Sequence, residues 1–211
     1  MIKLYGIDVS GNTYKARLLM NILNIEYQQI PVDMQNQAHK SPFFLKLNPR
    51  GEIPVLVDEK TVIWDSQAIL IYLARKYNAE SWHPDNAIEM AKISQWLSVA
   101  NNEIANTLAK ARAIIKFSYS GCLEDHQEQA KGVLAMINQH LENQQTNNLN
   151  WLVGDKPSIA DLACYPYIAL SHEGGISLEG YTAIHKWIEQ VQNLQGYINM
   201  PGLPFSARQQ S

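Results

Sequence analysis

Ser10 and Asn12 lie in a polar turn, "DVSGNTY", which follows a short apolar stretch and precedes apolar residues with helical spacing. A hydroxyl there can be an ordinary turn serine before a Gly-Asn pair. It can also donate a hydrogen bond to an anion at the helix N-terminus, where the helix dipole favours negative charge. Asn12 and Thr13 are rival donors in the same turn. The local sequence leaves both interpretations open.

A second group of candidates lies in "GEIPVLVDEKTVIWDSQAI". Asp65 and Ser66 stand where a helix begins, and N-capping explains both residue types. Pro54 stands at the head of a short strand, where its lack of a backbone N–H is tolerated. The local sequence favours a trans bond before Pro54, because only about 5–6% of X-Pro bonds in folded proteins are cis.

The elements around these residues predict a small α/β domain over residues 1–77. "IKLYG" reads as a strand, "GNTYKARLLMNILNI" as a helix capped by Thr13 or Asn12, and "EYQQIPV" as a strand, which fits a βαβ unit. Ser41 and Pro42 predict the start of a short helix. "VLV", the turn "DEKT" and "VIW" predict a hairpin, and "DSQAILIYLARKY" predicts a helix. The order is β-α-β-α-β-β-α.

The remainder predicts a linker over residues 78–86 and an all-helical domain over residues 87–205. Apolar residues three or four apart predict one long helix from about Leu97 to Ile115. "SIADLACYPYIAL" predicts a helix that opens with a capping box between Ser158 and Asp161. We expect Pro166 to kink or break that helix.

Composition excludes several classes of function. The 211 residues are 46% hydrophobic and 18% charged, with a net charge of −3 and no basic run, so we expect no nucleic-acid partner. No window approaches the roughly 18 apolar residues of a membrane span, and the N-terminus does not read as a signal peptide. Cys122 and Cys164 form no CxxC and the histidines show no ligand spacing, so we expect free thiols in a reducing cytoplasm and no metal.

The chain resembles the cytosolic glutathione transferases over nearly its whole length. The motifs are "NPRGEIPVL", "DSQAILIYLARKY", "SIADLACYPY" and "YTAIHKWIEQVQNLQGYINM", in this order and spacing. The resemblance implies a thioredoxin-like N-terminal domain, an all-helical C-terminal domain, a homodimer and glutathione as cosubstrate, without a metal. "SGNTYKAR" is similar to the serine-type classes (theta, zeta and tau-like), which would make Ser10 the residue that stabilises the glutathione thiolate. Asn12 and Thr13 remain rivals.

The resemblance also assigns roles around the cosubstrate. A cis bond at Pro54 would expose the backbone of Ile53 to the cysteinyl part of glutathione, like an added strand. Asp65 would pair with the γ-glutamyl ammonium and Ser66 would hold its carboxylate. His39 and Lys40 stand where the family often holds the glycyl carboxylate, although a solvated loop explains them nearly as well.

One residue departs from the family pattern. Many members carry a lysine where this chain has Glu52, and a carboxylate beside an anionic tripeptide is unfavourable unless it points away or Arg50 compensates it. For the second substrate, the candidates are Ile104, Leu108 and Tyr119, although core packing explains Ile104 and Leu108 at least as well.

We therefore expect a glutathione transferase that conjugates the thiolate to small apolar electrophiles. One alternative is a disulfide or peroxide reductase that uses bound glutathione. Another is a non-catalytic binding or regulatory protein on the same fold, to which Glu52 points. A zeta-like isomerase is a weaker alternative, because "SGNTYKAR" matches that class only in part.

Overall fold

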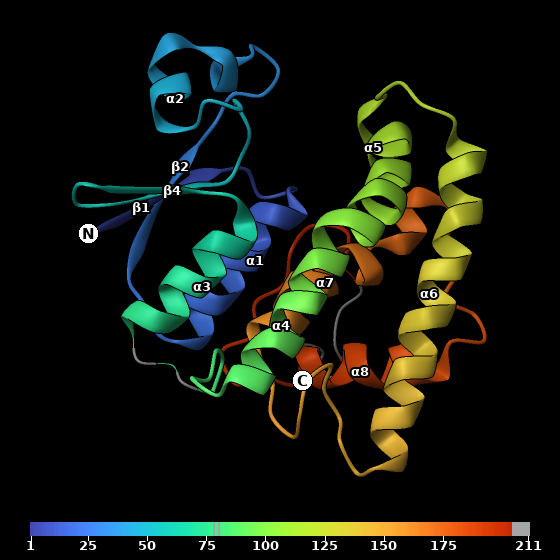
Figure 1. The fold of residues 1–211 in the computed structure, drawn as a ribbon. Helices are drawn as coiled ribbons and strands as arrows, with labels where there is room; N and C mark the ends of the chain where they lie inside the picture. Colours follow the sequence, from blue (N-terminus) through green and yellow to red (C-terminus); the bar gives the residue numbers. More distant parts are fainter. Residues whose placement is uncertain (78, 80, 204–211) are drawn as a thin grey trace, which may run out of the picture.

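The structure is a computed structural model that describes residues 1–77, 79 and 81–203. Within the predicted linker, residues 78 and 80 lie outside the described residues, as do residues 204 and 205 at the end of the predicted helical domain. A small sheet with its helices forms one part of the molecule, and a bundle of helices packs beside it (Figure 1). This is the predicted fold class, a thioredoxin-like domain followed by a helical domain.

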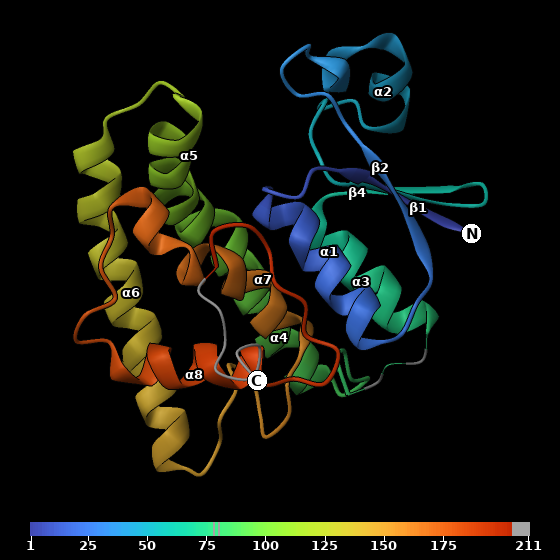
Figure 2. The same cartoon turned by 180° about the vertical axis from the view of Figure 1, so that it is seen from behind.

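The N-terminal part is a four-stranded sheet in the order β2-β1-β3-β4. Strands β1 and β2 are parallel, and β3 is antiparallel to both β1 and β4. Helices α1 and α3 lie side by side on one side of the sheet, and α2 lies on the other (Figures 1 and 2). The elements are β1 (Ile2–Gly6), α1 (Gly11–Ile22), β2 (Tyr27–Pro31), η1 (Ala38–Lys40), α2 (Pro42–Leu47), β3 (Val55–Asp58), β4 (Thr61–Trp64) and α3 (Ser66–Lys76). The predicted order is confirmed, with the short 3₁₀ helix η1 added.

The start of α1 differs from the prediction. Its N-cap is Ser10, not Asn12 or Thr13, and the Ser10 side chain accepts from the backbone of Thr13. Thr13 is fully buried against β1, where a Cβ atom on Gly6 would lie 2.4 Å from the Thr13 hydroxyl. The glycine therefore allows α1 to approach the end of β1 with the buried Thr13 side chain between them.

The C-terminal part is helical. Its elements are α4 (Ala87–Val99), the π-helix η2 (Ala100–Ala109), α5 (Lys110–Phe117), α6 (Leu123–Thr146), α7 (Ile159–Ala169), the 3₁₀ helix η3 (Ser171–Gly174) and α8 (Thr182–Gln192). The predicted long helix is present as the unbroken run of α4, η2 and α5, with a wider turn in its middle. Pro166 lies inside α7 without ending it, so a break at this proline is excluded.

The predicted capping box holds this bundle together. Asp161 is fully buried and accepts from the backbone N–H of Ser158 at 2.9 Å and of Leu152 at 3.0 Å. It also accepts from the indole N–H of Trp187 in α8 at 2.9 Å. One carboxylate thus joins α7, α8 and the loop before α7. Burial raises the pKa of Asp161 against the effect of these hydrogen bonds.

The two parts share one core. The Tyr14 hydroxyl in α1 donates to the carbonyl of Ile198 at 2.6 Å, and its ring lies 6.3 Å from that of Tyr165 in α7.

Cys122 is exposed, Cys164 is buried, and both are free thiols as expected. None of the helices in the described ranges is both long and apolar enough to cross a bilayer.

Candidate functional site

A cavity of about 660 Å³ opens where the first turn of α1 faces α5. Figure 1 shows this end of α1 directed toward the helical bundle. The lining comes from both parts of the molecule: Ile7, Ser10, Asn12, Met34, Gln35, Ile53, Ala109, Arg112, Ala113, Lys116, Phe117, Ser118, Tyr119 and Tyr167. Three residues predicted around the thiol, Ser10, Asn12 and Ile53, therefore meet at one cavity.

Ser10 serves as N-cap and faces the cavity with the same side chain. Its oxygen accepts a hydrogen bond from the Thr13 N–H at 3.2 Å. Capping therefore uses a lone pair of the hydroxyl and leaves its proton free to be donated. An anion at this place would also meet the positive end of the α1 dipole. The buried Thr13 does not line the cavity, so Ser10 and Asn12 are the donors of this turn that do.

Asp65 and Ser66 lie at the start of α3, next to this turn. Asp65 caps α3 by accepting from the N–H groups of Gln67 at 2.9 Å and Ala68 at 3.3 Å. Its φ of +75° is unusual for a non-glycine residue. The Ser66 hydroxyl lies 2.7 Å from the side-chain oxygen of Gln67 and 3.4 Å from that of Asn12. Neither Asp65 nor Ser66 lines the cavity, but Ser66 contacts a residue that does.

The loop before β3 brings Ile53 to the cavity. The Ile53–Pro54 peptide bond is cis, as the family resemblance implies. The Glu52 carboxylate is paired with the Arg50 guanidinium at 3.0 Å, and both side chains are more than half exposed. Glu52 is the residue that departs from the family pattern, and its negative charge is therefore balanced by Arg50 at the surface.

His39 and Lys40 do not line the cavity. They form the end of η1, which packs against the positive-φ residue Gly51, where a Cβ atom would lie 2.8 Å from the His39 carbonyl. The Lys40 ammonium donates to the Arg50 carbonyl at 3.0 Å. Burial and the nearby Lys40 lower the pKa of His39.

Of the residues predicted for the second substrate, Tyr119 lines the cavity. Ile104 and Leu108 are 0% and 1% exposed and belong to the core between η2 and its neighbours. Arg112, Lys116, Phe117 and Tyr167 line the cavity and were not predicted. The helical spacing of residues 104, 108 and 112 points one side of this helix toward the bundle, but the sequence alone does not show where the cavity begins.

Tyr167 reaches the first turn of α1 from α7. A Cβ atom on Gly11 would lie 2.8 Å from its ring, so the glycine permits this contact. Burial raises the pKa of the Tyr167 hydroxyl, while Arg112 and a hydrogen bond with the Asn12 backbone lower it in part. The Lys15 ammonium lies 5.4 Å from the centre of the ring. Tyr167 is therefore a neutral phenol with two cations near it.

Lys15 is a buried cation behind the site. Its side chain is 1% exposed, and burial lowers its pKa to about 8, while Cys164 and Asp65 act in the opposite direction. Together with the helix dipole, Lys15 makes the potential at the start of α1 more positive. This potential favours an anion over its neutral acid.

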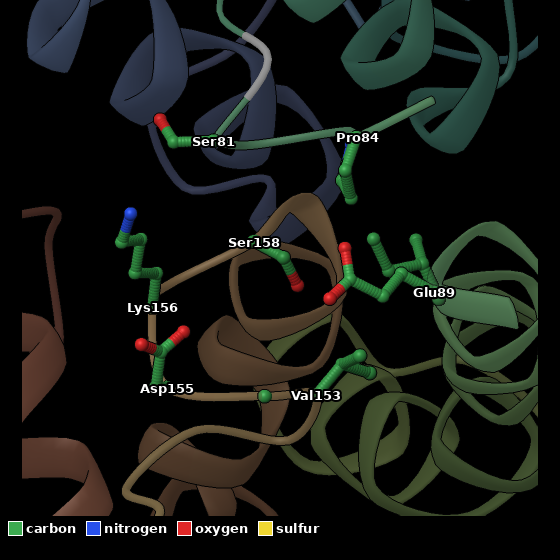
Figure 3. A pocket seen from close by; sticks show the side chains of 9 residues that line it. Ser81, Pro84, Glu89, Val153, Asp155, Lys156 and Ser158 are labelled. Atoms are coloured by element: carbon green, nitrogen blue, oxygen red, sulfur yellow. The ribbon is translucent and has the colours of Figure 1, made fainter. Parts of the chain in front are cut away.

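A second cavity, of about 350 Å³, lies away from this site between the linker, the start of α4 and the loop before α7. Figure 3 shows Glu89 and Ser158 turned toward the same space, with Lys156 and Ser81 on its other side. Ser158 is already engaged by the capping box. This cavity contains none of the predicted site residues.

Across the described ranges, no group of three His, Cys, Asp or Glu side chains is placed to hold a metal ion.

Comparisons with known proteins show which family the chain is similar to. Residues 1–75 match the family model "Glutathione S-transferase, N-terminal domain", and residues 91–195 match "Glutathione S-transferase, C-terminal domain". Glutathione S-transferase 3 of Zea mays is 32% identical over 169 residues, which cover 76% of this chain and 73% of that protein.

Two further proteins are similar over most of their length. Disulfide-bond oxidoreductase YfcG of Escherichia coli K12 is 28% identical, with 92% of this chain and 91% of that protein covered. The crystal structure of a glutathione S-transferase from Pseudomonas fluorescens superposes with a TM-score of 0.87 at 29% identity, covering 95% of this chain and 98% of that chain. The chain belongs to the glutathione S-transferase family.

Proposed function

We propose that this protein binds glutathione at the cavity and activates its thiol for attack on a small electrophile with an apolar body. The observation that carries the proposal is the Ser10 hydroxyl at the N-terminus of α1, which lines the cavity together with Ile53. Residues of the helical part, Phe117 and Tyr119, form the wall that would face the electrophile.

The activation is a matter of a few kcal/mol. A free cysteine thiol has a pKa of about 8.5. Lowering that pKa by about two units requires about 2.7 kcal/mol in favour of the thiolate. A charge-assisted hydrogen bond contributes roughly 1.5–3 kcal/mol. The Ser10 hydroxyl and the dipole of α1 are therefore sufficient together, which supports the proposal of a serine-type member.

The rest of glutathione is placed by the same elements. The Ile53 backbone would pair with the cysteinyl residue, and Asp65 with the γ-glutamyl ammonium. Ser66 would hold the γ-glutamyl carboxylate near the start of α3. Because Arg50 pairs with Glu52, it shields the carboxylate that would otherwise repel glutathione. His39 and Lys40 remain our candidates for the glycyl carboxylate.

We also propose two domains, residues 1–77 and 87–205, in a cytoplasmic homodimer. Exposed apolar residues on the neighbouring elements α2 and β4 support an interface there. They are Phe43, Leu45, Val62 and Trp64, which are between 37% and 62% exposed. Light scattering should give the mass of a dimer for the wild type and a lower mass for Phe43→Ser.

A second candidate function is reduction of disulfides by bound glutathione, which the relative named a disulfide-bond oxidoreductase favours. The test is to compare two rates with glutathione at saturation: conjugation of 1-chloro-2,4-dinitrobenzene and reduction of the mixed disulfide of glutathione and 2-mercaptoethanol. Faster conjugation supports the transferase and faster reduction supports the reductase. A folded protein that binds glutathione but performs neither reaction would be a non-catalytic member.

A further inference from the structure

Arg112 is a buried cation in the cavity wall with donor capacity left over. Its side chain is 3% exposed, and its Nε pairs with the Glu173 carboxylate at 2.5 Å. The guanidinium carbon lies 5.3 Å from the centre of the Phe117 ring. Among the described residues, its Nη2 nitrogen has no hydrogen-bond partner. A buried, charged N–H group without an acceptor is costly. An anion that accepts a hydrogen bond from this nitrogen would remove that cost, which favours its binding.

The balance of charge at this wall is positive. Lys116, one turn after Arg112, also pairs with Glu173, so one carboxylate faces two cations. Of the residues that line the cavity, Arg112 and Lys116 are cations and none is an aspartate or glutamate. The other titratable groups that line it are the tyrosines Tyr119 and Tyr167. An uncompensated positive charge therefore faces the space that the proposed function gives to the second substrate.

We propose that the second substrate carries a carboxylate or a similar anionic group, and that Arg112 determines this specificity by binding it. The inference rests on the proposed function. The apolar body of the substrate would lie against Phe117 and Tyr119, while its anionic group reaches the guanidinium. Arginine suits this role because its planar fork can bind a carboxylate while one edge stays on Glu173.

A carboxylate at Arg112 can come from the electrophile or from glutathione itself. Matched aryl chlorides separate the two sources: 4-chloro-3-nitrobenzoate and the neutral 4-chloro-3-nitrobenzamide. In both reactions the thiolate sulfur bonds to the ring carbon that carries chlorine, chloride leaves with the electron pair of the C–Cl bond, and the thiol proton passes to solvent. Each kcat/KM is divided by the uncatalysed rate constant, which removes the difference in intrinsic reactivity.

Three variants test the role of Arg112. In the wild type, we expect the normalised rate for the benzoate to exceed that for the benzamide at least tenfold. Arg112→Gln should remove this preference through a higher KM for the benzoate, with an unchanged Kd for glutathione. Lys110→Gln is the matched control, because it removes an exposed cation of the same helix that does not line the cavity. Glu173→Gln should increase the preference, because it removes the negative charge that partly neutralises Arg112 and Lys116.

Several results would overturn the inference. They are a wild type without preference for the benzoate, an Arg112→Gln variant that slows both substrates equally, and a loss of glutathione affinity in that variant. The last result would assign Arg112 to glutathione. Glu173→Gln separates a specificity role from a structural one. If the ion pair between Arg112 and Glu173 only stabilised the fold, its loss would not improve turnover of the benzoate. A wild type that binds no glutathione would instead refute the proposed function.

Discussion

The Ser10 hydroxyl accepts a hydrogen bond from the backbone N–H of Thr13 at 3.2 Å and lines the cavity between the two parts of the molecule. The bond fixes the oxygen at the N-terminus of α1 and leaves the hydroxyl proton available. Capping and the proposed donation to the thiolate would therefore use different parts of one group. Their effects can be separated by measuring stability and thiol activation in the same variant.

Ser10→Ala removes both the cap and the donor. We expect kcat for conjugation to fall about 10- to 100-fold, as loss of roughly 1.5–3 kcal/mol of thiolate stabilisation implies. The Kd for glutathione should change only a few-fold near pH 7, because the other proposed contacts of the tripeptide remain. The matched control is Asn86→Ala, which removes the N-cap of α4 away from the cavity. Both variants should lose about 0.5–2 kcal/mol of stability, and only Ser10→Ala should lose turnover.

Asp65 allows capping and binding to be separated. Asp65→Asn keeps a side-chain oxygen for the N–H groups of Gln67 and Ala68, and asparagine tolerates a positive φ. It removes the charge that would pair with the γ-glutamyl ammonium. We expect the Kd for glutathione to rise about tenfold with stability kept within about 0.5 kcal/mol, by titration calorimetry and urea unfolding. An unchanged Kd would leave Asp65 a cap and nothing more.

Lys15 should make stability depend on pH. Its pKa falls from 10.5 in the free side chain to about 8 in the folded protein. Between these pH values the unfolded chain binds a proton that the folded protein does not, so this group makes the free energy of unfolding rise with pH. At pH 7 both states are protonated, and the folded state carries the cost of a buried charge.

Lys15→Met should therefore stabilise the protein at pH 7, by up to about 3 kcal/mol. The gain should shrink as pH rises from about 8 toward about 10, because the wild-type lysine then becomes neutral. Urea unfolding at several pH values measures both effects. The control is Lys92→Met, since Lys92 is an exposed lysine of α4. A loss of stability in Lys15→Met at pH 7 would contradict this prediction, because it would mean that the Lys15 ammonium stabilises the folded state.

Asp161 is predicted to be structural only. Asp161→Ala leaves the N–H groups of Leu152, Ser158 and Trp187 without their acceptor, and each buried donor without a partner costs about 1–3 kcal/mol. We expect a loss of roughly 3–5 kcal/mol in urea unfolding. Asp155→Ala, at an exposed position in the preceding loop, should stay within about 0.5 kcal/mol of the wild type. Near-equal midpoints for the two variants would refute this role.

The sequence predicts well what local residues determine. The hairpin of β3 and β4, the cap at Asp65 and the capping box of Ser158 and Asp161 follow from turn and cap chemistry within a few residues. The cis bond before Pro54 is different: local statistics favour trans, and only the family resemblance implies cis. Of the kink or break expected at Pro166, the break is excluded, because α7 continues through the proline.

The cavity wall depends on contacts between segments that are distant along the chain, and these do not follow from local patterns. Ile104 and Arg112 lie on one helical run, but Ile104 enters the core while Arg112 meets Glu173 and the cavity. Tyr167 reaches the start of α1 only because Gly11 has no side chain. A periodic pattern identifies the buried side of a helix, whereas the packing of other elements decides which buried residues border a space.

The pKa of the glutathione thiol in the complex tests the central claim most directly. It is measured from the ultraviolet absorbance of the thiolate against pH, with glutathione saturating the protein and with glutathione alone. We predict a pKa of about 6.5 in the complex against about 8.5 for a free thiol, and a return toward the free value in Ser10→Ala. Glutathione that binds with an unchanged thiol pKa would contradict thiolate activation by this site.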